Sequence, residues 1–338
     1  MQKNEQEPIH FVTSVYGKKY GGMLLVLLYS ISKSNPMARA TIFWDDVTPR
    51  TRLLEKAFPQ FEFVDTGTSI KGDFIERIAN RPKFWTEAIR QHIGENFVFL
   101  DVDMLVRKDL RHFFEIPFDV AFTHKPGEVY PLNGGVYLMR ASEAAAAFLE
   151  ELNERTIHIT NIPELREQST TRAYPYGAPE QMAYWEMIAY DPSKADYTIS
   201  TKGHPIRVHA FPCSLLNETN SKPITDEMHV IHYKSIWHDI LLKGSDFNRR
   251  RTKQDSWEMY QLYLHTAQDA LRLVTAVDPT INSIRDMGIV IPMYMRGDFS
   301  ENAFVYRVFH LISNIQAYCR SVLVRGYQYL GLHKRPRS

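Results

Sequence analysis

Short apolar segments alternate with helix-like segments through about the first 240 residues, and this alternation restricts the folds that the chain can adopt. The segments with strand character are 9–15, 40–44, 61–64, 97–100, 120–122 and 135–139. The segments with helical character are 21–34, 50–58, 85–93 and 142–154. Strands that alternate with helices pair in parallel, and an unbroken apolar strand such as 97–100 is covered on both faces. The pattern therefore predicts an α/β domain with a mainly parallel sheet flanked by helices.

The pattern changes after about residue 242. Three arginines at 249–251 are followed by two long helical patterns, at 256–277 and at about 301–330, with few strand signals. We therefore predict two parts, an α/β domain over 1–242 and a helical region over 243–338.

The composition is that of an ordinary globular protein. Hydrophobic residues make up 44% of the 338 residues, and the net charge of +1 argues against a protein that coats nucleic acid. Two cysteines, Cys213 and Cys319, are too few for a disulfide scaffold or a zinc ribbon. Residues 1–7 lack the pattern of a signal peptide, and the apolar run 23–28 is too short to span a membrane. We therefore expect a cytoplasmic protein.

Asp101 and Asp103 directly follow the apolar strand 97–100. Residues two apart on a strand share a face, so both carboxylates are expected at the carboxyl end of a buried strand, where ligands bind in open α/β sheets. Carboxylate oxygens suit Mg²⁺ or Mn²⁺ and leave coordination positions for phosphate oxygens. The spacing alone is common, and a solvated strand end is the alternative. The apolar residues in front of the pair favour the metal site.

The histidine-rich segment 228–238 can complete such a site. In a strand, His232 and Lys234 share a face, so a neutral imidazole would join the carboxylates and a lysine would neutralise phosphate. His229 and His238 lie close by in the sequence, which leaves the choice of ligand open. A structural histidine is the alternative unless the segment meets the two aspartates.

Two further segments carry polar groups of the kind that bind sugars. Asn133 and Gly134 precede the strand 135–139, where an amide can bond hydroxyls and a glycine lets a ligand approach the backbone. An ordinary turn would look the same. Glu180 and Gln181 lie in the first turn of a predicted helix, where the helix dipole alone also favours an acid.

Taken in order, these segments resemble the metal-dependent glycosyltransferases of the GT-A fold, most closely glycosyltransferase family 8 and its relatives. The resemblance covers about residues 9–240 and includes the hydroxyl-bearing strand 11–16, the apolar helix 22–32 and the basic segment 81–85. The Asp-x-Asp strand, the Asn-Gly-Gly strand, the acidic residue before Gln and the late His follow in the same order. It implies a Rossmann-like nucleotide-diphospho-sugar transferase with a mixed, mainly parallel sheet.

The resemblance implies roles for individual residues on the nucleotide side. The residues implied to line the nucleoside pocket are Thr13, Ser14 and Tyr16, the last of them able to stack on the base. The ligands implied for Mn²⁺ or Mg²⁺ on the diphosphate are Asp101, Asp103 and His232. The cations implied near phosphate or sugar are Lys83 and Lys234. The family has several residues between the metal-binding His and the phosphate-binding Lys, whereas only Tyr233 separates them here.

On the sugar side, the resemblance implies that Asn133, Gly134, Glu180 and Gln181 surround the donor sugar. The family often has Asp where this chain has Glu180. If the reaction retains the anomeric configuration, Gln181 would stabilise the positively charged sugar; if it inverts, Glu180 is the candidate general base. The resemblance favours retention, a UDP-sugar donor and a glycan or lipid-linked acceptor.

Two other functions remain open. Haloacid-dehalogenase-like phosphatases also place Asp-x-Asp after an apolar strand, but Leu105 stands where they have a small hydroxyl residue or valine. Their further acidic residues follow the motif, whereas the pair Asp45 and Asp46 precedes it here. A protein that binds nucleotides or carbohydrates without turnover would use the same residues as a transferase.

The segment 301–338 contains no acidic residue after Glu301, and its apolar positions recur at helical spacing among arginines and tyrosines. A helix of this kind can bind an anionic membrane surface, or it can pack on the α/β domain or on a second subunit. The absence of acidic residues favours the membrane, so we expect peripheral binding to anionic lipid.

Overall fold

The structure, a computed structural model, describes residues 8–67, 79–125, 131–170, 178–219, 224–234, 236–243 and 254–290. Within these residues the main sheet has eight strands in the order β3-β2-β1-β4-β7-β6-β9-β8. These strands are β1 (Ile9–Tyr16), β2 (Arg39–Asp45), β3 (Glu62–Asp65), β4 (Asn96–Leu100), β6 (Val120–His124), β7 (Leu132–Arg140), β8 (Asp196–Thr201) and β9 (His204–Pro212). A small second sheet pairs β5 (Met104–Val106) with β10 (Val230–His232).

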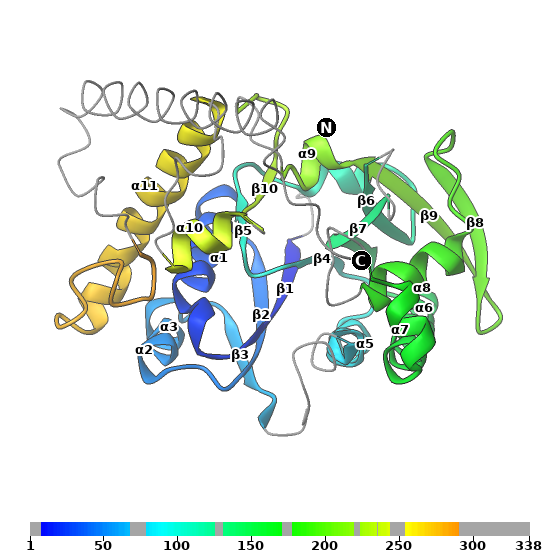
Figure 1. The fold of residues 1–338 in the computed structure, drawn as a ribbon, viewed down its shortest axis with the longest axis horizontal. Helices are drawn as coiled ribbons and strands as arrows, with labels where there is room; N and C mark the ends of the chain where they lie inside the picture. Colours follow the sequence, from blue (N-terminus) through cyan, green and yellow to red (C-terminus); the bar gives the residue numbers. More distant parts are fainter. Residues whose placement is uncertain are drawn as a thin grey trace, which may run out of the picture.

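Helices cover the sheet and connect its strands (Figure 1). Those of the first half are α1 (Gly21–Ser34), α2 (Pro49–Arg52), α3 (Leu54–Ala57), α5 (Arg81–Gln91) and α6 (Glu143–Asn161). Those of the second half are α7 (Pro163–Gln168), α8 (Pro179–Ile188), α9 (Cys213–Leu216), α10 (Ile236–Lys243) and α11 (Gln254–Val277).

Strand direction divides the sheet into a parallel block and a mixed part. The strands β3, β2, β1 and β4 all run parallel. Next to them β7 is antiparallel to both β4 and β6, while β9 is parallel to β6 and antiparallel to β8. The mixed, mainly parallel sheet expected from the resemblance is therefore confirmed. Its parallel block places the carboxyl ends of β1, β2 and β4 at one edge.

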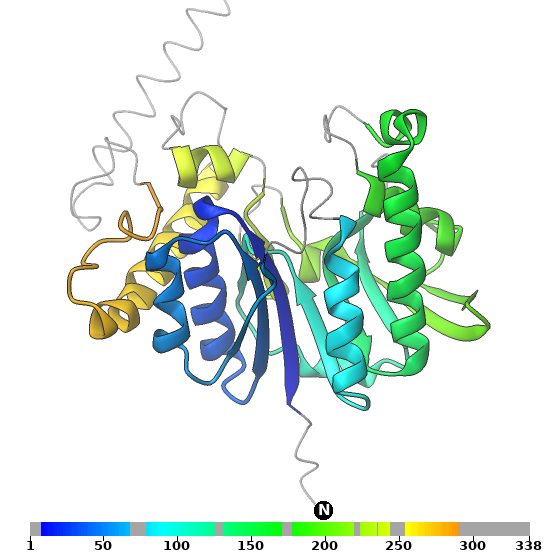
Figure 2. The same ribbon diagram turned by 90° about the horizontal axis from the view of Figure 1, so that it is seen from below.

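Two apolar clusters lie on opposite faces of the sheet, because successive side chains of a strand point to opposite sides. On β1, Phe11 and Val15 belong to the first cluster, which also contains residues of α1 and α11. Val12 belongs to the second cluster, with residues of α5, α6 and α8. Figure 2 shows these two groups of helices on either side of the central strands.

The helix α1 is buried along most of its length, which explains its unusual sequence. Residues 23–28 are all apolar, and each is 0% exposed. The helix packs against β5 on one side and α11 on another. A helix that is apolar all round is one buried all round, so this run belongs to the core of the domain.

The expected strands and helices of the α/β part are confirmed, with local differences. The expected helix 50–58 is split into α2 and α3 by a turn at Leu53. The hairpin of β8 and β9 was not predicted. The sequence of β8 has no apolar run, because alternate residues of this strand are exposed. The two-residue loop that follows, Lys202 and Gly203, has positive φ at both positions, as tight hairpins require.

The helical pattern at 256–277 is confirmed as α11, which contributes Met259, Tyr263 and Leu264 to the first apolar cluster. The division at residues 242 and 243 stays a prediction, and α11 shares an apolar cluster with residues of the α/β part. The predicted helix at about 301–330 and the proposed membrane-binding segment 301–338 lie outside the described residues. No helix among the residues described is both long and apolar enough to span a membrane.

We predict that α11 is an integral part of the core. Leu264→Ala should lower the free energy of unfolding by about 2–5 kcal/mol, because the side chain is 0% exposed and its removal leaves a cavity. The matched change Leu273→Ala removes a side chain on the same helix that is 38% exposed, and it should have a much smaller effect. Denaturant titration measures both. Equal effects would show that α11 does not share the core.

Candidate functional site

The pairing of β10 with β5 brings together the two segments that the sequence singles out. His232 on β10 lies opposite Met104, the first residue of β5. The backbone N–H of Tyr233 donates to the carbonyl of Asp103 at 2.7 Å. Asp101 and Asp103 follow β4 at the carboxyl edge of the parallel block, so this pairing places His232 beside both.

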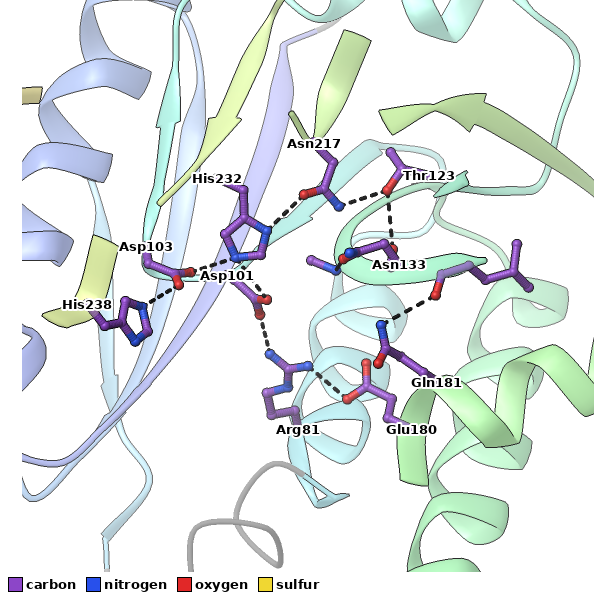
Figure 3. A network of polar contacts seen from close by, with 12 residues as sticks. Arg81, Asp101, Asp103, Thr123, Asn133, Glu180, Gln181, Asn217, His232 and His238 are labelled. Atoms are coloured by element: carbon purple, nitrogen blue, oxygen red, sulfur yellow. Dashed lines mark hydrogen bonds and ion pairs between the residues drawn. The ribbon is translucent and has the colours of Figure 1, made fainter. Parts of the chain in front are cut away.

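Asp101, Asp103 and His232, here called the metal triad, offer three ligand atoms that lie within 4.8 Å of one another (Figure 3). His232 Nε2 lies 3.1 Å from Asp103 Oδ1 and 3.8 Å from Asp101 Oδ2. Side-chain exposure is 3% for His232, 8% for Asp103 and 27% for Asp101. The triad is therefore buried at His232 and Asp103 and accessible to solvent at Asp101.

A chain of hydrogen bonds fixes which nitrogen of His232 carries its proton. The Thr123 hydroxyl donates to the carbonyl of Asn133 at 3.3 Å, so it accepts from Asn217 Nδ2 at 2.8 Å. The other end of the Asn217 amide is then an acceptor, and it lies 2.8 Å from His232 Nδ1. His232 Nδ1 is therefore the donor, as is usual for a metal-binding histidine whose second nitrogen is held.

With Nδ1 donating to Asn217, Nε2 is the ring nitrogen that is turned toward the two carboxylates. The three ligand atoms lie close enough together for one cation to contact all of them. Two carboxylates and an imidazole form the donor set that suits Mn²⁺ and related divalent ions. The chemistry of the residues present thus fits a divalent metal.

A second histidine contacts the triad from α10. His238 Nε2 lies 2.6 Å from Asp103 Oδ2, on the far side of that carboxylate from His232. Burial disfavours the charged carboxylate, yet the two histidines outweigh this effect and hold the pKa of Asp103 well below its usual value. The other candidate, His229, lies elsewhere and packs its ring on His112 and Phe113.

Arg81 connects the triad with the residues predicted to surround the donor sugar. Its Nη1 donates to Asp101 Oδ1 at 2.5 Å, and its Nη2 donates to Glu180 Oε2 at 2.8 Å. Arg81 and Lys83 both belong to the basic segment 81–85, in which the family resemblance implies that Lys83 lies near phosphate or sugar. Residues two apart on a helix do not share a face. Accordingly Arg81 faces the site, whereas the side chain of Lys83 is exposed on α5.

Glu180 is buried, and both of its carboxylate oxygens have partners. Oε2 accepts from Arg81, and Oε1 accepts from the Tyr137 hydroxyl at 2.9 Å. The missing side chain of Gly134 leaves room for this pair, since a Cβ there would lie 2.9 Å from the Tyr137 hydroxyl and 3.0 Å from Glu180 Oε1. Next to it, Gln181 Nε2 lies 3.4 Å from the carbonyl of Leu132.

Asn133 and Gly134 lie within β7 rather than in a turn before it. The Asn133 side chain accepts a hydrogen bond from the backbone N–H of Gly135 at 3.0 Å, and its own carbonyl anchors the Thr123 hydroxyl. Figure 3 shows Asn133 and Gln181 on the Glu180 side of the site, across from His238.

A cleft of about 150 Å³ lies in front of the triad. The described residues that line it are Ser14, Tyr16, Tyr20, Arg81, Asp101, Val102, Asp103 and His238. Thr13 belongs to the other face of β1, because it alternates with Ser14 along the strand, and it is 4% exposed. Lys234 follows β10, which ends at His232, so the predicted strand does not continue through it. From this segment, His238 lines the cleft and Lys234 does not.

Sequence reasoning missed Arg81, Asn217, Thr123 and Tyr137. Arg81 lies in the basic segment 81–85, but only the orientation of α5 shows that Arg81 rather than Lys83 faces the site. The other three act through hydrogen bonds between segments far apart in the chain, for which a single sequence carries no signal. The roles of Thr13, Lys83 and Lys234 stay predictions.

The chain was compared with known families, curated proteins and solved structures. No family model and no curated protein matches it. It is similar to the glycosyltransferase GlyE of Streptococcus pneumoniae TIGR4, with a TM-score of 0.50 and 12% identity over 82% of this chain. The matched region covers 64% of GlyE, so the chain spans less than two thirds of that protein. This chain has the GT-A fold. A likeness at 12% identity establishes the fold alone.

Two further solved structures show weaker similarity. One is the galactosyltransferase LgtC in complex with donor and acceptor sugar analogues, with a TM-score of 0.49 and 13% identity, over 77% of this chain and 95% of LgtC. The other is the bifunctional glycosyltransferase WbbM, with a TM-score of 0.44 and 12% identity, over 77% of this chain and 52% of WbbM.

We predict that Gly135 is required for the position of His232. A Cβ at Gly135 would lie 2.9 Å from His232 Cε1 and 2.6 Å from Met104 Cε, and the ring cannot retreat without losing its bond to Asn217. Gly135→Ala should therefore weaken Mn²⁺ binding about 10- to 100-fold, as loss of a group that orients a ligand does. Isothermal titration with Mn²⁺ measures the change.

The neighbouring substitution Gly134→Ala is the matched control. Its Cβ would press on Tyr137 and Glu180 rather than on the triad, so Mn²⁺ affinity should stay close to that of the original protein. If both variants lose Mn²⁺ affinity equally, the effect is a general distortion of β7.

Proposed function

We propose that this protein is a metal-dependent glycosyltransferase that moves a sugar from a nucleotide-diphosphate donor to a glycan or lipid-linked acceptor, with retention of configuration. The observation that carries the proposal is the metal triad at the carboxyl edge of a GT-A sheet, facing a cleft lined by Ser14 and Tyr16. In open α/β folds this edge is where nucleotides bind.

The triad would hold Mn²⁺ or Mg²⁺ against the donor diphosphate. When bound, such an ion acts as a Lewis acid that stabilises the negative charge developing on the leaving diphosphate. The protein's own residues orient the ligands. Arg81 holds Asp101, His238 holds Asp103, and Asn217 holds His232. The imidazole ligand favours Mn²⁺, since Mg²⁺ takes oxygen ligands almost alone.

The contacts of Glu180 support retention over inversion. An inverting transferase needs a free carboxylate to remove the proton from the acceptor hydroxyl. Glu180 instead gives one oxygen to Arg81 and the other to Tyr137, so it serves to orient Arg81. Gln181 follows it on α8 and is the residue we assign to the reacting carbon of the donor sugar.

The finer parts of the proposal rest on the family resemblance. A UDP-sugar is the expected donor, with Tyr16 against the base. His238, which lines the cleft, is better placed for the leaving diphosphate than Lys234. Peripheral binding to anionic membranes through 301–338 would bring the site to a lipid-linked acceptor.

One assay separates this proposal from the two alternatives. Incubation with nucleotide sugars and Mn²⁺ should release nucleoside diphosphate slowly, and faster with an acceptor. A phosphatase would release phosphate from monoesters instead, and a binding protein would do neither. The GT-A fold does not favour the phosphatase alternative. In a phosphatase Asp101 would have to act as the nucleophile, whereas here it is paired with Arg81.

Asp103→Ala should abolish Mn²⁺-dependent binding of the donor while the protein stays folded. The change removes a proposed metal ligand, and Asp103 belongs to neither apolar cluster, so the core of the sheet keeps its packing. A ligand that binds only the folded state raises its melting temperature, so UDP-sugars should raise Tm with Mn²⁺ in the original protein and fail to do so in the variant.

The control is Asp226→Ala, because the Asp226 side chain is fully exposed in a loop. This variant should keep the full Mn²⁺-dependent rise in Tm. An unchanged rise in Asp103→Ala would contradict the assignment of the triad.

Gln181→Ala should lower turnover more than the affinity for nucleoside diphosphate, because the amide would act on the sugar. Steady-state kinetics and titration with the nucleoside diphosphate measure the two quantities. Glu186→Ala, an exposed position on the same helix, should change neither. Equal losses of turnover and nucleotide affinity in Gln181→Ala would point to a structural role for this residue.

A further inference from the structure

A second cluster of metal-ligating side chains lies at the opposite edge of the sheet. It consists of His10 near the start of β1, and His92 and Glu95 in the turn between α5 and β4; we call it the amino-edge cluster. The His10 side chain is 4% exposed, whereas those of His92 and Glu95 are 29% and 27% exposed. The cluster has no part in the proposed transfer reaction.

Hydrogen bonds fix the proton of His10 in the same way as that of His232. The Thr41 hydroxyl donates to Glu62 Oε2 at 3.1 Å, so it must accept from His10 Nε2, which lies 2.8 Å away. In the neutral ring the other nitrogen, Nδ1, then has a lone pair. Nδ1 lies 3.2 Å from Glu95 Oε2, so this lone pair faces a carboxylate.

The surroundings of His10 favour the neutral ring. Burial lowers the pKa of His10 and outweighs the opposing effect of Glu95. Phe97 stacks on the ring at 4.6 Å between centroids, and His92 packs edge-on at 4.8 Å. The buried His10 ring and the Glu95 carboxylate are thus held close enough to contact one ion.

The donor atoms of the three residues lie close enough together to share one ion. His92 Nδ1 lies 3.3 Å from Glu95 Oε1, and His10 Nδ1 lies 3.2 Å from Glu95 Oε2. Ligand atoms about 2.0–2.1 Å from zinc at tetrahedral angles are about 3.3 Å apart. One ligand atom from each residue lies within 4.8 Å of the others.

We propose that His10, His92 and Glu95 bind a Zn²⁺-class transition-metal ion at the amino edge of the sheet, separate from the metal triad. Two imidazoles and one carboxylate are the ligands that zinc accepts, and water would take the fourth position. The ion would fasten the start of β1 to the turn before β4.

Arg39 is the charged group that opposes this site. Its Nη1 lies 2.8 Å from Glu95 Oε1, and it neutralises the carboxylate that the metal would need. The Arg39 side chain is 58% exposed, so it can turn into solvent when the ion binds. Because Arg39 competes with the ion for Glu95, removing Arg39 should tighten metal binding.

The test uses the full chain carrying Asp103→Ala, so that the triad no longer binds metal. Titration with Zn²⁺ should show one equivalent bound and a rise in Tm. Adding His92→Ala should weaken Zn²⁺ binding by more than about 100-fold, beyond the effect of losing a group that merely orients a ligand. His204→Ala removes an exposed histidine at the start of β9 and should leave binding unchanged.

Two more variants complete the test. Glu95→Gln should also abolish Zn²⁺ binding while keeping the size of the side chain, which covers the case in which His92→Ala fails to fold. Arg39→Ala should tighten Zn²⁺ binding several-fold. The proposal is overturned if the Asp103→Ala protein binds no Zn²⁺, if His92→Ala and Glu95→Gln bind it equally well, or if Arg39→Ala weakens binding. Nucleoside diphosphate release by protein with Asp103 intact tests the transferase separately.

Discussion

The antiparallel pairing of β10 with β5 is the constraint on which the candidate active site depends. It places His232 beside two aspartates that follow β4, and it does so through backbone hydrogen bonds. The chain of side-chain hydrogen bonds from Asn133 through Thr123 and Asn217 then sets the proton on His232. Without that chain the ring could present either nitrogen. The structure thus fixes both the place and the orientation of the His232 ring.

Arg81 links the triad to Glu180, next to the residue proposed to contact the donor sugar. Its guanidinium joins Asp101, after β4, to Glu180, at the start of α8, so the two halves of the site are held in one geometry. The bond from Tyr137 completes the surroundings of Glu180. A buried carboxylate with partners on both oxygens positions other groups rather than accepting protons, and this is the physical reason for favouring Gln181 at the reacting centre.

The sequence predicted what depends on local pattern. The apolar strand before Asp101 and the apolar helix α1 carry periodicities that indicate their structures, and the order of motifs identified the GT-A fold. It could not predict which of Arg81 and Lys83 faces the site, because that depends on how α5 packs. It extended the strand past His232, where α10 follows, and it missed the β8–β9 hairpin, which lacks an apolar run. Contacts such as that of Asn217 with His232 join segments that no local pattern relates.

The two clusters differ in how much of the chain each requires, and this bears on the order in which a growing polypeptide can acquire them. His10 and Glu95 are 85 residues apart, so the amino-edge cluster is complete once the chain has been made through residue 95. The triad joins Asp101 and Asp103 to His232, so it cannot close before His232 has been synthesised. Because a chain is made from the N-terminus onward, the residues of the amino-edge cluster are all present before those of the triad. A nascent chain therefore contains every strand of the parallel block, β1 to β4, well before it contains the last residue of the triad.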